Sequence, residues 1–189
     1  MGFHTFDVDK AGRLEDAAKR YRSVSREELL GGLELTGSET VADLGSGTGF
    51  YTDDVAPYAA RVYAVDIQPE MHEFYREKGV PEGVELVTSS IEELPFDDDE
   101  LDSAVSTMTY HEFASDDSLA ELARVLRPGG RLVIADWSVE GEGKSGPPVD
   151  ERYAASDAAT ALDAAGFEIV AERSRPETFV VVARRRDHQ

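Results

Sequence analysis

Cysteine is absent from the 189 residues of this sequence. The chain can therefore form no disulfide, no thiolate metal site and no cysteine nucleophile. The sequence also lacks any run of about 18 apolar residues, and residues 1–10 lack the basic-then-apolar order of a secretory signal peptide. We predict a protein that does not span a membrane and carries no such export signal, and we expect no metal site.

Positive charge is scarce. Lysine and arginine together number 19 against 39 aspartates and glutamates, so the formal net charge is −20 and the pI is near 4.4. Because nucleic acid is a polyanion, this balance argues against DNA or RNA as a partner. The acidic residues are spread along the chain, and four of the 19 basic residues are lysine. This is typical of a salt-adapted cytoplasmic protein, so we expect a halophilic archaeal source; the alternative is an acidic, solvated surface in an ordinary cell.

Short apolar segments alternate with helical patterns along most of the chain. The apolar segments predict strands at 40–44, 61–65, 84–87, 101–105 and 131–135, and the amphipathic ones predict helices within 10–35 and at 50–58, 69–78 and 118–126. Such alternation indicates parallel β-α-β units in an open sheet with helices on both faces.

Two further strands, 167–173 and 178–183, are separated by only four residues. So short a connection cannot carry a parallel crossover, and the two strands must therefore be antiparallel neighbours. Before them, we expect Ser156 to cap a helix that ends next to Gly166.

The predicted fold is thus α/β, a Rossmann-like and mostly parallel sheet of seven strands with helices on both faces and an antiparallel C-terminal strand. A chain of this length fits one domain. We expect residues 1–189 to form that domain, in the order helical leader (1–37), core (38–183) and tail (184–189).

Three glycines, Gly45, Gly47 and Gly49, follow the first predicted strand and precede a helix. Glycine allows a tight turn and leaves no Cβ between the backbone and a ligand, while free N–H groups at a helix start favour a polar ligand. Asp66 ends the second strand 21 residues after Gly45 (66 − 45), near the spacing of about 20 at which a carboxylate reaches a ribose. The alternatives are a plain tight turn and a helix cap at Asp66.

The spacing of the glycines separates two ligand classes. Dinucleotide sites prefer Gly-x-Gly-x-x-Gly, and here the third glycine comes one residue early. Asp43, two residues before Gly45, gives the turn an anion that suits a cationic ligand better than a pyrophosphate.

Asp43 to Gly49 resembles the first motif of class I S-adenosylmethionine-dependent methyltransferases, and Val65 to Ile67 resembles the second. Further similar segments follow in order at 88–96 and 124–132, and the terminal hairpin resembles that family's reversed last strand. The resemblance covers residues 38–183 and is strongest to the small type 11 group. It implies S-adenosylmethionine as the cofactor.

Residue by residue, the resemblance implies a methionine-binding turn, a ribose carboxylate and an adenine pocket. The turn would be Asp43, Gly45, Ser46, Gly47 and Gly49; Asp66 would bind the ribose; Ile67 and Ile91 would flank the adenine with Ser90 at its edge; and Thr107 would lie beside the methionine end. For Ile67 and Ile91, burial in the core is an equally good interpretation.

Methyl transfer mainly requires alignment of acceptor and methyl group, and a base assists when the acceptor carries a proton. His111 and Glu112 follow the fourth strand, at the edge where open sheets bind ligands, and are the catalytic candidates. The alternative is that residues 110–113 simply begin a helix.

The type 11 group also resembles this chain at His4–Asp7, at Lys10–Leu14 and in the loop around Gly146–Pro148. This implies that the leader and the loop cover an acceptor pocket. Its lining could then include Tyr21, Trp137 and Arg152, although Tyr21 fits a packed helix face better.

The function expected from these features is methyl transfer to a small-molecule acceptor in the cytoplasm. A non-catalytic S-adenosylmethionine-binding sensor or partner subunit is the alternative, and an NAD-dependent oxidoreductase is disfavoured by the glycine spacing.

Overall fold

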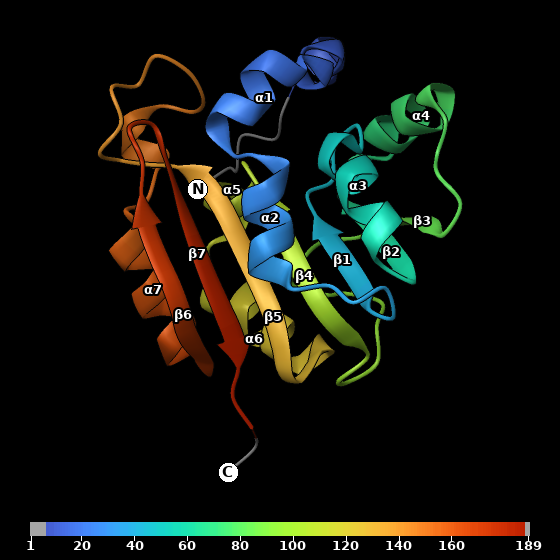
Figure 1. Ribbon diagram of the computed structural model, residues 1–189. Helices are drawn as coiled ribbons and strands as arrows, with labels where there is room; N and C mark the ends of the chain where they lie inside the picture. The colour runs from blue at the N-terminus through green and yellow to red at the C-terminus, as the bar shows by residue number, and fades with distance from the viewer. Residues whose placement is uncertain (1–6, 188–189) are drawn as a thin grey trace.

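A seven-stranded sheet forms the centre of the molecule (Figure 1). The structure is a computed structural model that describes residues 7–187. The strands are β1 (Thr40–Leu44), β2 (Arg61–Asp66), β3 (Val84–Thr88), β4 (Leu101–Thr107), β5 (Leu126–Trp137), β6 (Phe167–Ser174) and β7 (Thr178–Arg185). They are ordered β3-β2-β1-β4-β5-β7-β6, and β7 is antiparallel to both of its neighbours. The predicted Rossmann-like fold with a reversed C-terminal strand is confirmed.

The helices alternate with the strands as the hydrophobic pattern predicts. They are the 3-10 segments η1 (Val8–Glu15), η2 (Ala56–Tyr58) and η3 (Val149–Glu151), and the α-helices α1 (Ala17–Ser23), α2 (Arg26–Leu33), α3 (Phe50–Val55), α4 (Pro69–Lys78), α5 (Tyr110–Phe113), α6 (Asp116–Val125) and α7 (Ala155–Ala164). The helical region expected within residues 10–35 is therefore a 3-10 segment followed by two helices. Residues 1–6, which include part of the predicted leader and of the His4–Asp7 motif, lie outside the described residues.

Successive residues of the buried strands point to opposite faces of the sheet. In β5, Leu132 and Ile134 belong to one hydrophobic cluster, whereas Val133 and Ala135 belong to another. Helices α6 and α7 pack in the first cluster, and α2 and α3 pack in the second, so both faces are covered (Figure 1). Each large aliphatic side chain that is fully buried in these layers contributes about 1.5–3 kcal/mol.

Strand β5 begins five residues earlier than predicted. Leu126 pairs with Leu101, but the next pair in register is Arg131 with Ser103, so residues 127–130 bulge from the ladder. The bulge contains Pro-Gly-Gly, and a Cβ on Gly130 would lie 2.8 Å from the Arg127 carbonyl oxygen. The proline and the crowded glycine explain why this part of the strand has no alternating pattern.

The prediction that Ser156 caps a helix is wrong. Helix α7 begins at Ala155 with Ala154 as its N-cap residue, and the Asp157 carboxylate accepts a hydrogen bond of 3.1 Å from the Ala154 N–H. An acidic residue at the third position of a helix can satisfy the N–H before the helix in this way, so the helix starts earlier. Gly166, just after α7, has a φ of +97° as expected.

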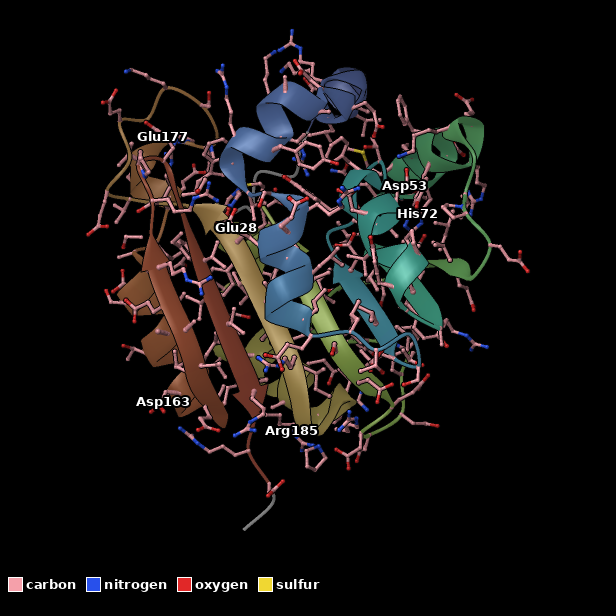
Figure 2. The ribbon with its side chains drawn as sticks, in the orientation of Figure 1. Glu28, Asp53, His72, Asp163, Glu177 and Arg185 are labelled. Atoms are coloured by element: carbon pink, nitrogen blue, oxygen red, sulfur yellow. The ribbon has the colours of Figure 1, made fainter. Side chains whose placement is uncertain are left out.

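Helix α2 holds the leader against the rest of the molecule. Glu28 closes a capping box with Ser25 at its N-terminus, and its carboxylate also accepts a 2.9 Å hydrogen bond from Arg175 in the β6–β7 connection (Figure 2). The Ser23 carbonyl oxygen accepts a further bond from the same guanidinium, at 2.8 Å. Helix α1 is thereby fixed at the carboxyl end of the parallel strands, where the loop after β5 also lies (Figure 1).

Candidate active site

A cavity of about 710 Å³ lies at the carboxyl ends of β1, β2, β4 and β5. Such volumes are typical of small-molecule sites, and open α/β sheets bind ligands at this edge. Ten of the twelve residues predicted for the site line it: Gly45, Ser46, Gly47, Asp66, Ile67, Ser90, Ile91, Thr107, His111 and Glu112. Residues more than sixty positions apart in the sequence are thus brought into one cavity.

The glycine-rich turn is held by its own backbone. The N–H groups of Gly45 and Ser46 each donate to the Val65 carbonyl oxygen at 2.9 Å, which ties the turn to the end of β2. Gly45 has a φ of +73°, and a Cβ there would lie 2.3 Å from Cγ2 of Thr109. This position therefore requires glycine both for its conformation and for the close approach of Thr109, which follows β4.

Asp66 lies where the turn meets the end of β2. Its Oδ2 accepts a 2.8 Å hydrogen bond from the Gly47 N–H, and its Oδ1 accepts one of 2.9 Å from the Gln68 N–H. Burial raises the pKa of the carboxyl, although these hydrogen bonds oppose the shift. The helix-cap interpretation does not hold, because the N-cap residue of α4 is Gln68. Each carboxylate oxygen keeps a second acceptor direction that a ligand hydroxyl can use.

Asp43 and Gly49 lie behind the turn and do not line the cavity. Asp43 is fully buried, and its Oδ2 accepts a 2.6 Å hydrogen bond from Oγ1 of Thr52. Burial raises the pKa of this carboxyl to about 6. Gly49 has a φ of +79°, and a Cβ there would lie 2.1 Å from the ring of Tyr75. Both residues therefore shape the turn from its inner side.

One polar atom at the turn shows that it fits a polar ligand. Oγ of Ser46, a residue that lines the cavity, is buried and has no hydrogen-bond partner among the described residues. Buried polar atoms are almost always paired in folded proteins, so an orphaned hydroxyl calls for an explanation. A ligand with polar groups at the turn supplies one, and a hydroxyl can pair with either the amino or the carboxylate group of an amino-acid moiety.

Ile67 and Ile91 differ in their surroundings. Ile67 is 55% exposed, so the core-burial interpretation is wrong for this residue, whereas Ile91 is 9% exposed and belongs to a core cluster. Both line the cavity, as does Ser90. The two isoleucines give the lining apolar surface, which suits a flat ring system.

His111 lines the cavity and forms a pair with Asp136. Nδ1 of the imidazole lies 2.9 Å from Oδ2 and 3.0 Å from Oδ1 of Asp136, whose carboxylate also accepts from the backbone N–H groups of His111 (2.6 Å) and Trp137 (2.8 Å). Because a carboxylate only accepts hydrogen bonds, Nδ1 carries a proton, and in the neutral imidazole Nε2 has the lone pair. Oε1 of Glu112 lies 3.8 Å from that Nε2. Residues 110–113 also form α5. The two interpretations of this segment, a helix start and a part of the site, are therefore both correct for its position in the structure.

The three ionisable groups of this cluster shift one another's pKa. Burial alone would lower the pKa of His111, but the hydrogen bond and charge of Asp136, together with the charge of Glu112, outweigh it and raise the pKa. Burial raises the pKa of Glu112 to about 7, although the nearby imidazole opposes this. The pKa of the Glu112 carboxyl therefore lies near neutral pH, the range in which general acid–base groups work.

Of the three residues expected to line an acceptor pocket, only Trp137 lines the cavity. Tyr21 packs against Phe50 with ring centroids 5.2 Å apart and donates a 2.9 Å hydrogen bond to Asp54. It therefore belongs to a packed helix face, the interpretation that the sequence favoured. Arg152 lies behind Trp137, with its guanidinium 5.5 Å from that ring, and holds the loop through the Pro147 carbonyl oxygen. The loop itself reaches the cavity at Gly146–Pro148, as Leu14 of η1 does.

Sequence reasoning missed Arg20, Thr109 and Asp136. Asp136 sits near the carboxyl end of β5, next to the end of β4 in register, so the strand-end rule that selected His111 could have selected it too. Arg20 lies on α1, and no sequence signal links it to the cavity that it lines. Within residues 7–187, no cluster of metal-ligating side chains and no helix long and apolar enough to cross a membrane is found.

A family model described as a methyltransferase domain matches residues 42–134. An uncharacterized methyltransferase of Mycobacterium tuberculosis is 33% identical over 75% of this chain and 62% of its own length. This chain thus spans less than two thirds of that relative. The [4+2]-cyclase SpnF has the same fold, with a TM-score of 0.76, 20% identity and coverage of 86% of this chain and 80% of its own. At that identity the likeness shows the fold alone.

A solved structure that is more than 30% identical also resembles the chain over almost its whole length. A SAM-dependent methyltransferase from Aquifex aeolicus is 31% identical, with a TM-score of 0.85 and coverage of 95% of this chain and 99% of its own. Together with the methyltransferase domain match and the glycine turn, Asp66 and the reversed strand β7, this places the chain in the family of S-adenosylmethionine-dependent methyltransferases.

Proposed function

We propose that this chain binds S-adenosylmethionine in the cavity and transfers its methyl group to a small-molecule acceptor. The observation that carries the proposal is the position of the His111–Asp136 pair, which opens into the same cavity as the glycine turn and Asp66. The proposed cofactor site and the proposed base therefore open into one cavity. A sensor that only binds the cofactor has no need of a buried, oriented base.

The residues at the turn fit the cofactor. Gly45, Ser46 and Gly47 would surround its methionine part, with Asp43 and Gly49 shaping the turn from behind. Asp66 would accept hydrogen bonds from the ribose hydroxyls. Ile67 and Ile91 would flank the adenine, with Ser90 at its edge, and Thr107 would lie at the methionine end, where it is 5% exposed.

When bound, S-adenosylmethionine supplies a methyl group on a sulfonium sulfur. Nε2 of His111 takes the proton of the acceptor, and Asp136 stabilises the resulting imidazolium through Nδ1. Glu112 adds a second carboxyl near Nε2, the atom that takes the proton. Such a base contributes about 10²–10⁴-fold in rate, and alignment of the acceptor in the cavity can supply about 7–11 kcal/mol more.

Two segments that border the cavity, the leader and the loop after β5, support the proposal of a small acceptor. Leu14 of the leader and Gly146–Pro148 of the loop both line it, so an acceptor must fit beneath them. We propose that the leader acts as a lid within a single domain. Nucleic acid is disfavoured, because acidic groups dominate the described lining and Arg20 is its one lysine or arginine.

We also propose that the protein works in the salt-rich cytoplasm of a halophilic archaeon. A formal net charge of −20 on 189 residues repels itself strongly in dilute solution. At 1 M salt the Debye length falls to about 3 Å, and this repulsion is screened. The cofactor is an intracellular metabolite, which agrees with a cytoplasmic site of action.

Two experiments in molar potassium chloride test the proposed function. Calorimetry with S-adenosylhomocysteine and with NAD should detect binding of the first alone. A screen of cell-extract metabolites with isotopically labelled S-adenosylmethionine should then reveal a methylated product. Binding without transfer to any acceptor would favour the sensor, and absence of binding would reject both.

Variants of the pair test the base. His111→Ala should lower kcat by about 10²–10⁴-fold and leave the affinity for S-adenosylhomocysteine unchanged. Because Asp136 raises the pKa of His111, Asp136→Asn should move the acidic limb of the kcat/KM profile to lower pH. An undiminished rate in His111→Ala would remove the histidine from the mechanism. The exposed substitution Glu73→Gln is the matched surface control.

A further inference from the structure

Arg20 is a cation in an otherwise acidic cavity. The ionisable residues that line the cavity along with it and His111 are acidic: Asp66, Glu92, Glu112 and Glu151. Arg20 belongs to α1 in the leader, whereas most of the lining comes from segments at the ends of the strands. A lone guanidinium in such surroundings marks one place where a ligand anion would be favoured.

The guanidinium of Arg20 has no hydrogen-bond or ion-pair partner among the described residues. Its Nε is buried without a hydrogen bond, and no described residue forms an ion pair with it. Its Cζ lies 4.7 Å from the ring centroid of Tyr51 and 5.5 Å from that of Phe50, so aromatic faces hold it in place. Tyr51 is itself fixed, because its hydroxyl donates to the Arg20 carbonyl oxygen at 2.8 Å. A partly buried guanidinium whose Nε is unsatisfied is unfavourable, and a ligand anion would relieve it.

The leader contacts the glycine turn beside this arginine. Oγ1 of Thr48 donates to Glu15 of η1, and Lys78 pairs with the same carboxylate at 3.3 Å. A Cβ on Gly47 would lie 3.4 Å from Cδ1 of Leu14. Arg20, Gly47 and Thr48 all line the cavity, so the leader and the turn close the same volume.

We propose that Arg20 binds the carboxylate of the methionine part of S-adenosylmethionine, which makes the leader a part of the cofactor site. The inference rests on the proposed function, because that function puts an amino-acid moiety at the glycine turn. A carboxylate elsewhere on the lining would face acidic side chains, and a guanidinium offers it two parallel hydrogen bonds. Arg20 would act as a binding residue that couples the cofactor to closure of the leader.

The test compares two ligands in molar potassium chloride. S-adenosylhomocysteine carries the carboxylate, and 5′-methylthioadenosine shares its adenosine and thioether but lacks the amino-acid end. Arg20→Met should weaken S-adenosylhomocysteine by about 10- to 100-fold and leave 5′-methylthioadenosine unchanged. Arg20→Lys, which keeps the charge, should restore part of the loss. Arg22→Met, an exposed position on the same helix, is the control and should change neither affinity.

The outcomes separate the inference from the function on which it rests. Unchanged S-adenosylhomocysteine affinity in Arg20→Met would overturn the inference and leave the proposed function intact. Equal weakening of both ligands would also overturn it, because the arginine would then support the shape of the pocket. If the wild-type protein bound neither ligand, the proposed function itself would fail.

Discussion

Glu112→Gln should stabilise the protein at alkaline pH and not at acidic pH. Glu112 has a side chain that is 20% exposed, and burial raises its pKa from 4.5 to about 7. The folded state therefore binds the proton more tightly than the unfolded chain does. As pH rises through this window, the free energy of unfolding falls, because folding must then bury an ionised carboxylate.

The size of the effect follows from the pKa. At 1.36 kcal/mol per pH unit, the change from 4.5 to about 7 corresponds to about 3 kcal/mol above pH 7. Glutamine has the shape of the neutral acid and avoids this cost. For a chain of 189 residues, each kcal/mol moves Tm by about 2–4 °C, so Glu112→Gln should raise Tm by about 6–12 °C at pH 8 and by little at pH 4.

Thermal unfolding followed by circular dichroism at constant potassium chloride measures this difference. Glu73→Gln removes the same charge from an exposed position and corrects for the general relief of acidic repulsion. An equal gain at pH 4 and pH 8, or a gain no larger than that of Glu73→Gln, would refute the reasoning. The same variant should be slower in methyl transfer, since stability and function conflict at such a site.

Three further predictions concern the turn, the surface and the cover of the cavity. Gly49→Ala would place a Cβ 2.1 Å from the ring of Tyr75 at a φ of +79°, and should cost about 3–5 kcal/mol in urea unfolding. Gly37→Ala, with a φ of +95° and open space, should cost only about 1–2 kcal/mol; equal losses would mean that the clash is unimportant. Tm should rise from dilute buffer to molar potassium chloride, and an unchanged midpoint would contradict the screening argument. Limited proteolysis within residues 7–35 and 137–150 should slow when S-adenosylhomocysteine is bound, whereas equal cleavage rates would count against a lid.

The order of the strands and helices was predictable from the sequence because it depends on local patterns. Alternation of side chains has a period of two in strands and about 3.6 in helices, whatever the rest of the chain does. A four-residue connection also forces β6 and β7 to be antiparallel. The prediction failed where a local pattern was broken, as in the Pro-Gly-Gly bulge of β5, or where a neighbouring acidic residue displaced a cap, as at Asp157.

The glycine turn and Asp66 could also be found in the sequence, because backbone conformation and strand ends are local properties. What only the tertiary structure decided is which side chains meet across long separations. Asp136 reaches His111 from another strand, and Arg20 reaches the cavity because α1 is fixed at the carboxyl end of the sheet. Such contacts depend on how elements pack in space, and packing distances leave no periodic signal in the chain.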